Sequence, residues 1–564
     1  MGYGRGRHHY FFCPKPDDFE FLLESDIEFV EATAELPAYW KFAGTLFPEI
    51  KFELWLPAEK QWNKRFYMAG CGGFCGGVDT SFPVGQFTKN IKWGIVRGYA
   101  SATTDSGHDN GGKGRTYAEW ARNNRRGEVD WGYRAVHEVA RVCKALICLF
   151  YNRPPKYSYF AGCSFGGRQA IMQALRYPED FDGVISGAPA LEYTGLVATW
   201  MSWIAQAVDG VTFNAEDIAA VQQAVLDQCD GIDGVEDGLI SDPRRCPQID
   251  FGGTGLSGDQ LAALEQIYRK AENSLGAVLY EGVMPYGSEI YWPIWVPNVA
   301  TTPEAPGIGL IGPFNENFLR DMAFQTDDPA FTANDFDFDA HPALLEFMGK
   351  IYNALSTDLT KFYKLGKKMI IYHGWADSIV PPTRTIAYYE AVVAAMGGLG
   401  KTQKFARLFL VPGMDHCSTA QAFTFIGFDN FDALGALEYW VEKGIAPDEI
   451  LASGKDLIGD ARSRPLYPYP LFAQYRGGDP YDPDSFGPAD DGTVRWPRFR
   501  KDTFYAFEIN GLRDNPVSEG ELLRHFYPYD FDLGPGLRYD WRVWSPSMLF
   551  DTDYPGFNGT FDVE

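Results

Sequence analysis

The sequence predicts an α/β fold in which a mostly parallel sheet is covered by helices on both faces. Short apolar runs have the length and composition of buried strands, and they lie at 51–56, 65–68, 98–103, 156–161, 368–372 and 407–411. Segments 132–151 and 167–176 show the apolar spacing of helices and lie beside these runs. Strands that alternate with helices are typical of a parallel sheet with both faces buried.

The chain of 564 residues is long enough for three to four domain-sized units. We expect residues 1–194 to hold the first part of the α/β core. Residues 195–360 contain a Gly/Asp-rich loop, an aromatic cluster and a Pro/Gly-rich stretch, which predicts an inserted domain. Residues 361–475 return to the core, and 476–564 are rich in Pro, Tyr, Asp and Gly. This last segment is predicted to wrap over the core.

Composition excludes several classes of protein. Hydrophobic residues make up 45% and charged residues 22%, which excludes a wholly disordered chain. A net charge of -25 repels nucleic acid, and no apolar run approaches the ~18 residues of a membrane helix. We therefore expect neither a nucleic acid nor a membrane as partner. The start, MGYGRGRHHYFF, lacks the apolar region of a signal peptide, so the protein is either intracellular or has had its signal removed.

The strongest chemical motif is Gly162-Cys163-Ser164-Phe165-Gly166, which fits the G-x-S-x-G pattern of a nucleophile elbow. A strand pattern ends just before it and a helix pattern begins just after it. Small residues on both sides allow a sharp turn that lifts the serine above the sheet. Because this context is the one that the motif requires, we interpret Ser164 as a nucleophile rather than part of an ordinary turn.

The partners of this serine follow from the order Ser, Asp/Glu, His that hydrolases of this architecture use. His416 lies in VPGMDHC after an apolar strand, and it is favoured over His525 in the C-terminal segment. Asp377 follows the strand 368–372, and it is favoured over Asp415, which neighbours the histidine in the chain. In this hypothesis Ser164 attacks an acyl carbon, His416 transfers its proton, and Asp377 orients the imidazole.

An oxyanion hole needs two N–H donors. We expect one from Phe165, the residue after the nucleophile. The glycine-rich loop after strand 65–68 is predicted to supply the other from Gly72 or Gly73. If Ser164 and His416 lie within hydrogen-bonding distance, their neighbours Cys163 and Cys417 are close enough for a disulfide.

The other cysteines give weaker signals. Nine cysteines leave at least one thiol unpaired within the chain. Cys143 and Cys148 lie in a helical pattern that favours buried free thiols. Cys71 and Cys75 flank glycines, but no second pair of ligands follows at zinc-site spacing, so a metal there is not favoured.

These motifs resemble the tannase/feruloyl esterase family over residues 37–475, with its Cys-Ser, Asp and His-Cys arrangement. The matching segments are WNKRFYMAGCGGFCGG, TTDSGHDN, WGYRAVHEV, YFAGCSFGGRQAIMQALRYPEDFDGVISGAPA, HGWADSIVPP and VPGMDHC. The resemblance implies an α/β-hydrolase core with a lid domain inserted before the acid. It implies hydrolysis of esters of aromatic, often phenolic, acids, and it makes the Cys163–Cys417 bond a family feature.

The resemblance also interprets the acidic segment 229–246, CDGIDGVEDGLISDPRRC, as a structural calcium loop closed by a Cys229–Cys246 disulfide. Spaced carboxylates and backbone carbonyls are ligands that calcium prefers. By this match the ion is held by the following groups: the side chains of Asp230, Asp233 and Asp237, and the carbonyls of Val235 and Leu239. A solvated acidic turn is the alternative.

Two cysteine pairs that the family usually has are missing here. Near the N-terminus the family pairs a cysteine with the one in an LPAxC segment; here Cys13 is present, but Trp40 replaces the second cysteine. Near the end of the match, Tyr467 replaces the cysteine of the family's CPYP segment. Their absence weakens the inference of secretion, so extracellular and intracellular locations both stay open, as does the oligomeric state.

The inserted domain is expected to line the substrate pocket with aromatic residues, although for any one of these residues a place in the domain's own core is favoured. They are Trp200, Trp203, Tyr280, Tyr286, Tyr291, Trp292 and Trp295. The leading hypothesis is a serine carboxylic ester hydrolase that acts on feruloyl, galloyl or related aromatic esters. The alternative keeps the triad in an acyltransferase or a lactone- or depside-cleaving enzyme of biosynthesis.

Overall fold

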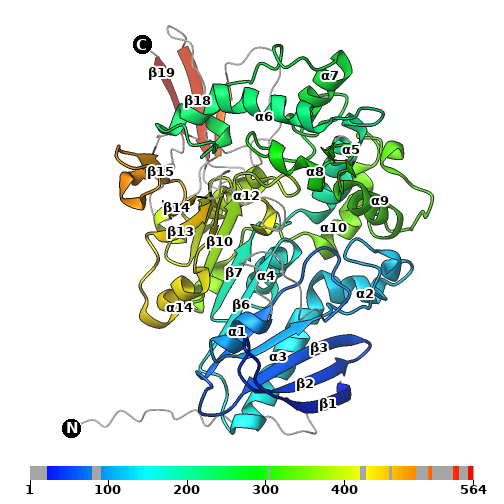
Figure 1. Ribbon diagram of the computed structural model, residues 1–564, viewed down its shortest axis with the longest axis vertical. Helices are drawn as coiled ribbons and strands as arrows, with labels where there is room; N and C mark the ends of the chain where they lie inside the picture. Colours follow the sequence, from blue (N-terminus) through cyan, green and yellow to red (C-terminus); the bar gives the residue numbers. More distant parts are fainter. Residues whose placement is uncertain are drawn as a thin grey trace.

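The computed structural model describes residues 22–78, 91–302, 305–418, 427–455, 460–490, 506–510, 538–544 and 557–562. Its centre is a nine-stranded sheet in the order β1-β2-β3-β5-β4-β6-β7-β10-β11 (Figure 1). The strands are β1 (Leu22–Val30), β2 (Tyr39–Leu46), β3 (Ile50–Pro57), β4 (Arg65–Ala69), β5 (Ala100–Thr104), β6 (Tyr157–Cys163), β7 (Gly183–Gly187), β10 (Lys368–Gly374) and β11 (Ala406–Val411). Strands β5, β4, β6, β7, β10 and β11 pair in parallel, and β1, β2, β3 and β5 pair antiparallel.

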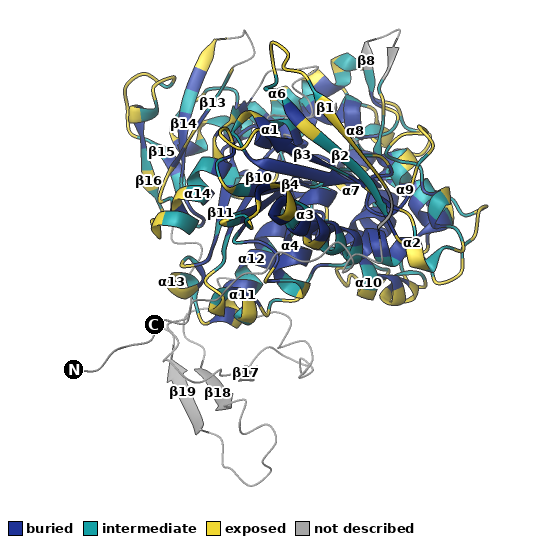
Figure 2. Ribbon diagram, turned by 90° about the horizontal axis from the view of Figure 1, so that it is seen from below, coloured by how far each residue is buried: buried dark blue, intermediate teal, exposed yellow. Residues whose placement is uncertain are grey.

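The parallel strands are buried because helices cover both faces of the sheet, which confirms the predicted fold class. One core cluster packs the sheet against α3 (Ala135–Tyr151), α4 (Phe165–Arg176) and α12 (Pro382–Met396). A second cluster packs the other face against α1 (Ile91–Val96) and α14 (Ala433–Lys443). Figure 2 shows the central strands as a dark, fully buried layer between these helices.

Between β7 and β10, which are neighbours in the sheet, the chain leaves the core and forms a largely helical region. Its helices are α5 (Met201–Ala207), α6 (Ala215–Cys229), α7 (Gly258–Ile267), α8 (Trp292–Trp295), α9 (Ile311–Asp321), α10 (Glu346–Tyr352) and α11 (Thr360–Lys364). In Figure 1 most of them lie beyond the ends of β6, β7 and β10. All of these helices except α11 share one apolar cluster with Trp131 and Phe165 of the α/β part, so this region is packed onto the core.

The remaining elements are short. Small sheets are formed by β8 (Ala300–Thr302) with β9 (Ala305–Pro306), by β12 (Gly427–Asn430), β13 (Ile450–Lys455) and β14 (Ala461–Leu466), by β15 (Phe472–Tyr475) with β16 (Phe486–Ala489), and by β17 (Ala506–Asn510), β18 (Arg538–Trp544) and β19 (Phe557–Asp562). Helices α2 (Arg125–Val129) and α13 (Leu399–Thr402) complete the α-helices among the described residues.

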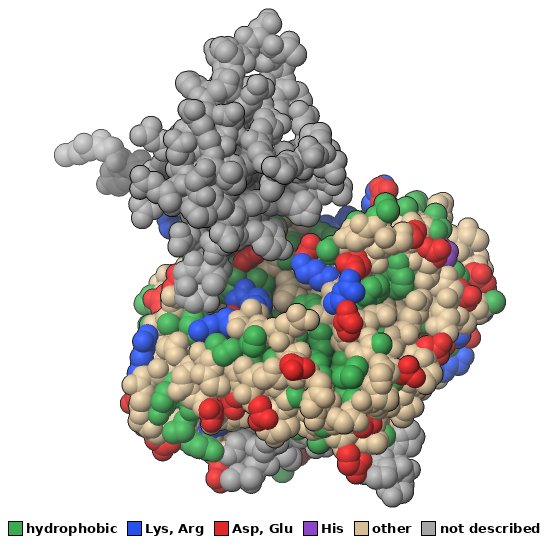
Figure 3. Space-filling model, turned by 90° about the horizontal axis from the view of Figure 1, so that it is seen from above, with side chains coloured by type: hydrophobic (Ala, Val, Ile, Leu, Met, Phe, Trp, Pro, Cys, Tyr) green, Lys and Arg blue, Asp and Glu red, His purple; other side chains and the backbone are tan. Residues whose placement is uncertain are grey.

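Most of the segment predicted to wrap over the core, 476–564, lies outside the described residues, so that prediction and the domain boundaries stay predictions. None of the helices that the structure describes is long and apolar enough to cross a membrane. Acidic side chains are spread over the face shown in Figure 3, in keeping with the net charge of -25.

Candidate active site

Ser164 lies at the turn between β6 and α4, where the sequence placed a nucleophile elbow. Its backbone has φ 64° and ψ -124°, a conformation that non-glycine residues rarely adopt. A Cβ at Gly162 would lie 2.6 Å from the backbone of Gly166, and a Cβ at Gly166 would lie 2.8 Å from the Cys71 carbonyl oxygen. The turn therefore requires glycine on both sides of the serine, and it sets Ser164 at the start of a helix.

His416 and Asp377 come from the loops after β11 and β10, and the structure brings them together. His416 Nδ1 lies 2.6 Å from Asp377 Oδ2. The other carboxylate oxygen, Oδ1, accepts hydrogen bonds from the backbone N–H groups of Ile379 and Val380, at 3.1 and 2.8 Å. Burial alone would raise the pKa of Asp377, but His416 and His373 hold it at about 2. This acid is therefore an anion at neutral pH.

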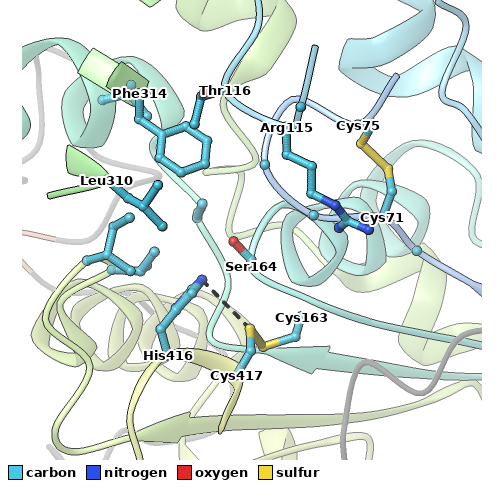
Figure 4. A pocket seen from close by; sticks show the side chains of 18 of the residues that line it. Cys71, Cys75, Arg115, Thr116, Cys163, Ser164, Leu310, Phe314, His416 and Cys417 are labelled. Atoms are coloured by element: carbon cyan, nitrogen blue, oxygen red, sulfur yellow. Dashed lines mark hydrogen bonds between the residues drawn. A yellow bond between two sulfur atoms is a disulfide. The ribbon is translucent and has the colours of Figure 1, made fainter. Parts of the chain in front are cut away.

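The same pair changes the basicity of the histidine. Burial disfavours the charged imidazole, but the Asp377 carboxylate outweighs burial and raises the pKa of His416. In Figure 4, His416 and Ser164 face one cavity. A carboxylate at Nδ1 leaves Nε2 to exchange a proton with a substrate or a serine.

His373 is a second histidine in this network, and it precedes the acid in the chain. It is fully buried at the end of β10. Its Nε2 lies 2.7 Å from the Val380 carbonyl oxygen and 3.1 Å from Asp377 Oδ2. Since a carbonyl only accepts, Nε2 carries the proton, and Nδ1 accepts from the Thr385 hydroxyl at 2.9 Å. We interpret His373 as a positioning residue for Asp377.

We predict that His373→Phe lowers kcat about tenfold to a hundredfold, because a hydrogen bond to a charged group contributes about 1.5–3 kcal/mol. His373→Gln retains an N–H donor and is expected to recover part of the loss. The measurement is kcat over a pH series, together with the melting temperature of each variant. Unchanged kcat in a folded His373→Phe variant would show that Asp377 needs no such support.

Asp415, the alternative acid, has a different partner. Its Oδ1 accepts a hydrogen bond from Trp295 Nε1 at 3.0 Å, whereas His416 Nδ1 is bonded to Asp377. Burial first, and then the nearby Asp377 carboxylate, raise the pKa of Asp415 to about 7. The Trp295 ring stands edge-on to the His416 ring, with centroids 5.6 Å apart. The inserted region therefore contacts the histidine directly. The other alternative, His525, lies outside the described residues.

The disulfides agree with the resemblance and also include cysteines that it did not pair. Cys163–Cys417 and Cys229–Cys246 are both formed. Cys71–Cys75 is also a disulfide, across the glycine loop, so the two sulfurs are not available as metal ligands. Cys143 is a buried free thiol as predicted, but the prediction for Cys148 is wrong because this residue is disulfide-bonded.

The loop that Cys71–Cys75 closes is the one predicted to hold the second oxyanion donor. Gly72 and Gly73 both line the cavity, and Gly73 has φ +60°. The Cys71 N–H donates to Gln169 Oε1 at 3.2 Å, and the Cys75 N–H donates to the Gly72 carbonyl at 3.0 Å. The first bond holds the start of the loop against α4, and the second closes the loop on itself. Which glycine faces an oxyanion, with Phe165 as the second donor, stays a prediction.

We predict that the double variant Cys71→Ser/Cys75→Ser lowers kcat at least about tenfold with little change in KM, since loss of one oxyanion donor costs about 10²–10³ in kcat. The measurement is steady-state kinetics on the oxidised protein. Cys143→Ala, which removes a buried thiol elsewhere, is the control and is expected to keep kcat. A double variant with full kcat would exclude a positioning role for this disulfide.

Ser164 opens into a cavity of about 850 Å³ whose walls are mainly apolar. The inserted region contributes Leu310, Phe314 and Trp295 to its wall. Of the seven aromatic residues considered for the pocket, Trp295 alone appears among the described lining residues. Trp200, Tyr280, Tyr291 and Trp292 are buried in the core of the inserted region, as the alternative reading allowed. Phe314 was missed because its helical spacing from Ile311 and Phe318 does not distinguish a pocket residue from a core residue.

The acidic segment 229–246 is a compact loop closed by its disulfide. Asp230 Oδ2 accepts from the Gly238 N–H at 2.9 Å, and Asp233 Oδ1 accepts from the Val235 N–H at 3.1 Å. Asp237 Oδ2 forms an ion pair with Arg464 Nη2 at 2.5 Å. Among the described residues, no group of three or more Asp, Glu, His or Cys side chains is arranged to hold a metal. The donor types suit calcium, but the carboxylates do not converge on one point.

Comparisons with known proteins agree with this geometry. The sequence profile of the family described as Tannase and feruloyl esterase matches residues 38–487. A probable feruloyl esterase of Arthroderma benhamiae is 31% identical, over 78% of this chain and 83% of its own. The mono(2-hydroxyethyl) terephthalate hydrolase of Piscinibacter sakaiensis is 32% identical, over 79% and 84%. The crystal structure of feruloyl esterase B from Aspergillus oryzae is 25% identical, with a TM-score of 0.68 over 85% of this chain and 99% of that one.

Proposed function

Because the chain belongs to the tannase and feruloyl esterase family and is a carboxylic ester hydrolase, we propose that it cleaves esters of aromatic acids through an acyl-enzyme on Ser164. The observation that carries this proposal is the buried Asp377–His416 pair, whose histidine lines the same mainly apolar cavity as Ser164. Two proteins that this chain resembles have names that specify feruloyl and terephthalate esters. Aromatic acyl groups are common to both.

In the proposed reaction Ser164 Oγ attacks the ester carbonyl while His416 Nε2 takes the hydroxyl proton. The carbonyl oxygen becomes an oxyanion, and the N–H of Phe165 and one from Gly72 or Gly73 stabilise it. The C–O bond then breaks, and His416 returns the proton to the leaving alcohol. Water attacks the acyl-enzyme by the same path and releases the acid. Asp377 stays ionised throughout and stabilises the imidazolium, in agreement with its pKa of about 2.

The experiment is acid release from methyl ferulate, methyl gallate, a terephthalate monoester and an aliphatic ester. We expect turnover of one or more aromatic esters, well above the aliphatic ester, and products that contain the free acid. Transfer of the acyl group to an added alcohol or phenol in preference to water would favour the acyltransferase alternative. Absence of turnover of any ester by the folded protein would contradict the proposal.

We also propose a structural calcium ion in the loop 229–246, with the side chains of Asp230, Asp233 and Asp237 and the carbonyls of Val235 and Leu239 as its ligands. Three carboxylates and two carbonyls are a donor set for a hard cation. Binding requires the carboxylates to turn from their present partners toward one centre. The Leu239 side chain packs close to Gly413, in the loop that carries His416, so an ordered acidic loop would support the histidine.

We predict that calcium raises the melting temperature and that a chelator lowers it, because an ion that binds only the folded state stabilises that state. Asp230→Asn is expected to remove the calcium-dependent shift. Asp227→Asn, which changes an exposed acid on the preceding helix, is the matched control and should keep it. The same melting temperature with calcium and with chelator would contradict calcium binding.

A further inference from the structure

One helical turn of the inserted region presents two hydrogen-bond donors to the loop that carries His416. The Tyr291 hydroxyl donates to the Gly413 carbonyl oxygen at 3.0 Å. The Trp295 indole N–H donates to Asp415 Oδ1 at 3.0 Å. Tyr291, Trp295 and Asp415 are at most 3% exposed, so water competes little for these bonds. The inserted region therefore holds this loop at two points within three residues of the histidine.

The turn that carries the two donors is itself held firmly. The donors are four residues apart, so they lie on the same side of the turn. Between them, Trp292 is fully buried, and its indole N–H donates to the Ser288 hydroxyl at 3.1 Å. The Trp292 carbonyl accepts from the Val296 N–H at 2.8 Å. Because the turn belongs to the apolar cluster of the inserted region, that cluster sets the position of both donors.

The loop of His416 needs support because its backbone is strained. Cys417 and Ser418, which follow the histidine, have φ of 55° and 58°. Residues with a Cβ rarely adopt this conformation, and it persists only where the surroundings fix it. From the α/β core, the Ala376 N–H donates to the Met414 carbonyl at 3.1 Å, and a disulfide holds Cys417. The inserted region adds its two side-chain hydrogen bonds to these contacts.

Trp295 also contacts the imidazole, since the two rings stand at 90° with centroids 5.6 Å apart. We infer that Trp295 and Tyr291 are positioning residues, which act through the loop of His416 to keep the imidazole turned toward the cavity that holds Ser164. Asp415 is the acceptor through which Trp295 acts. A misplacement of about 1 Å in a reacting group can cost about 10²-fold in rate. This inference rests on the proposed function and gives the inserted region a part in the reaction beyond forming the cavity wall.

A double-mutant cycle tests whether Trp295 acts through Asp415. Trp295→Phe keeps an aromatic ring in the cavity wall and removes the donor, and Asp415→Ala removes the acceptor. Each is expected to lower kcat on the best aromatic ester by about tenfold to a hundredfold with little change in KM. Because both changes break the same bond, the double variant should lose no more than either single variant. Asp415→Asn retains an acceptor oxygen and should recover most of kcat.

Tyr291→Phe removes the second donor, and it should lower kcat by about threefold to tenfold, the effect of one neutral hydrogen bond. The matched controls are Trp203→Phe and Tyr388→Phe. They remove an indole bond to the Gln266 carbonyl and a hydroxyl bond to the Ser356 carbonyl, both outside the described cavity wall. Both controls should keep kcat, and the melting temperature of every variant shows whether it is folded.

Additive losses in the double variant would show that Trp295 acts on the substrate independently of Asp415, and they would overturn the inference. An unchanged kcat in a folded Trp295→Phe variant would overturn it as well.

A second measurement separates failure of this inference from failure of the proposed function. The rate at which a fluorophosphonate labels Ser164 depends on His416 and requires no ester. We expect labelling to slow by about tenfold or more in Trp295→Phe and to stay unchanged in Trp203→Phe. Slower labelling of Trp295→Phe, in a protein whose wild type hydrolyses no ester, would reject the ester substrate and keep the positioning role. Ester turnover with the same kcat and labelling rate in wild type and Trp295→Phe would do the reverse.

Discussion

Ser164→Ala is expected to lower kcat/KM for the best aromatic ester by at least about 10⁴-fold, because without the hydroxyl the acyl-enzyme cannot form. The change removes one oxygen at a turn whose backbone bonds are independent of the side chain. The Ser164 N–H donates to Gly187, and its carbonyl accepts from Arg168 and Ala190. The melting temperature should therefore change little. Acid release and thermal unfolding on the same preparation check both statements.

Ser274→Ala, an exposed serine of the inserted region, is the control for this variant and should keep full activity. A fluorophosphonate that reacts with serine nucleophiles should label the wild type and Ser274→Ala, and leave Ser164→Ala unlabelled. If Ser164→Ala retained turnover, the hydrolytic reaction would have to use another nucleophile.

Replacement of both Cys163 and Cys417 by alanine is expected to have the largest effect on stability. The bond joins residues 254 apart in sequence, and the chain-entropy model gives about 5 kcal/mol for a loop of this length. Cys417 and Ser418 also have φ of 55° and 58°, so the loop beside His416 holds strained backbone that the bond helps to fix. We expect kcat to fall as well, because the link between the two catalytic loops is lost. Urea unfolding and kcat measure the two effects.

The Cys229→Ala/Cys246→Ala pair is the comparison for this double variant. It opens a loop with a separation of 17, for which the same model gives about 3 kcal/mol. The smaller loss of stability should come with a much smaller loss of kcat. Equal effects of the two double variants on kcat would mean that the Cys163–Cys417 bond has no special connection with the reaction.

The central sheet could largely be predicted from sequence because its parallel strands are buried on both faces and are therefore continuously apolar. β4, β5, β6, β10 and β11 were found in this way within two residues of their bounds. The antiparallel strand β3 was found with the same accuracy. β7 was missed because GVISG has glycine at both ends, and those glycines allow close packing that a single sequence does not reveal. β1 was missed because its polar residues are typical of an exposed edge strand.

The three catalytic residues could be predicted because the fold fixes their order along the sequence. Ser164, Asp377 and His416 follow strands that end at one edge of the sheet, so their loops must meet. The contacts of Trp295 with Asp415 and His416, and the support that His373 gives to Asp377, depend on how loops pack, which spacing does not encode. The Cys71–Cys75 bond could have been predicted from the short spacing of the two cysteines, which are separated in part by two glycines.

The most direct test of the central claim is the mass of the enzyme quenched in acid during turnover of an aromatic ester. We expect a burst of alcohol release and a mass increase equal to one acyl group, located by peptide mapping on the peptide that contains Ser164. Ser164→Ala should show neither. Steady turnover with no burst and no adduct, or an adduct on another residue, would contradict an acyl-enzyme on Ser164.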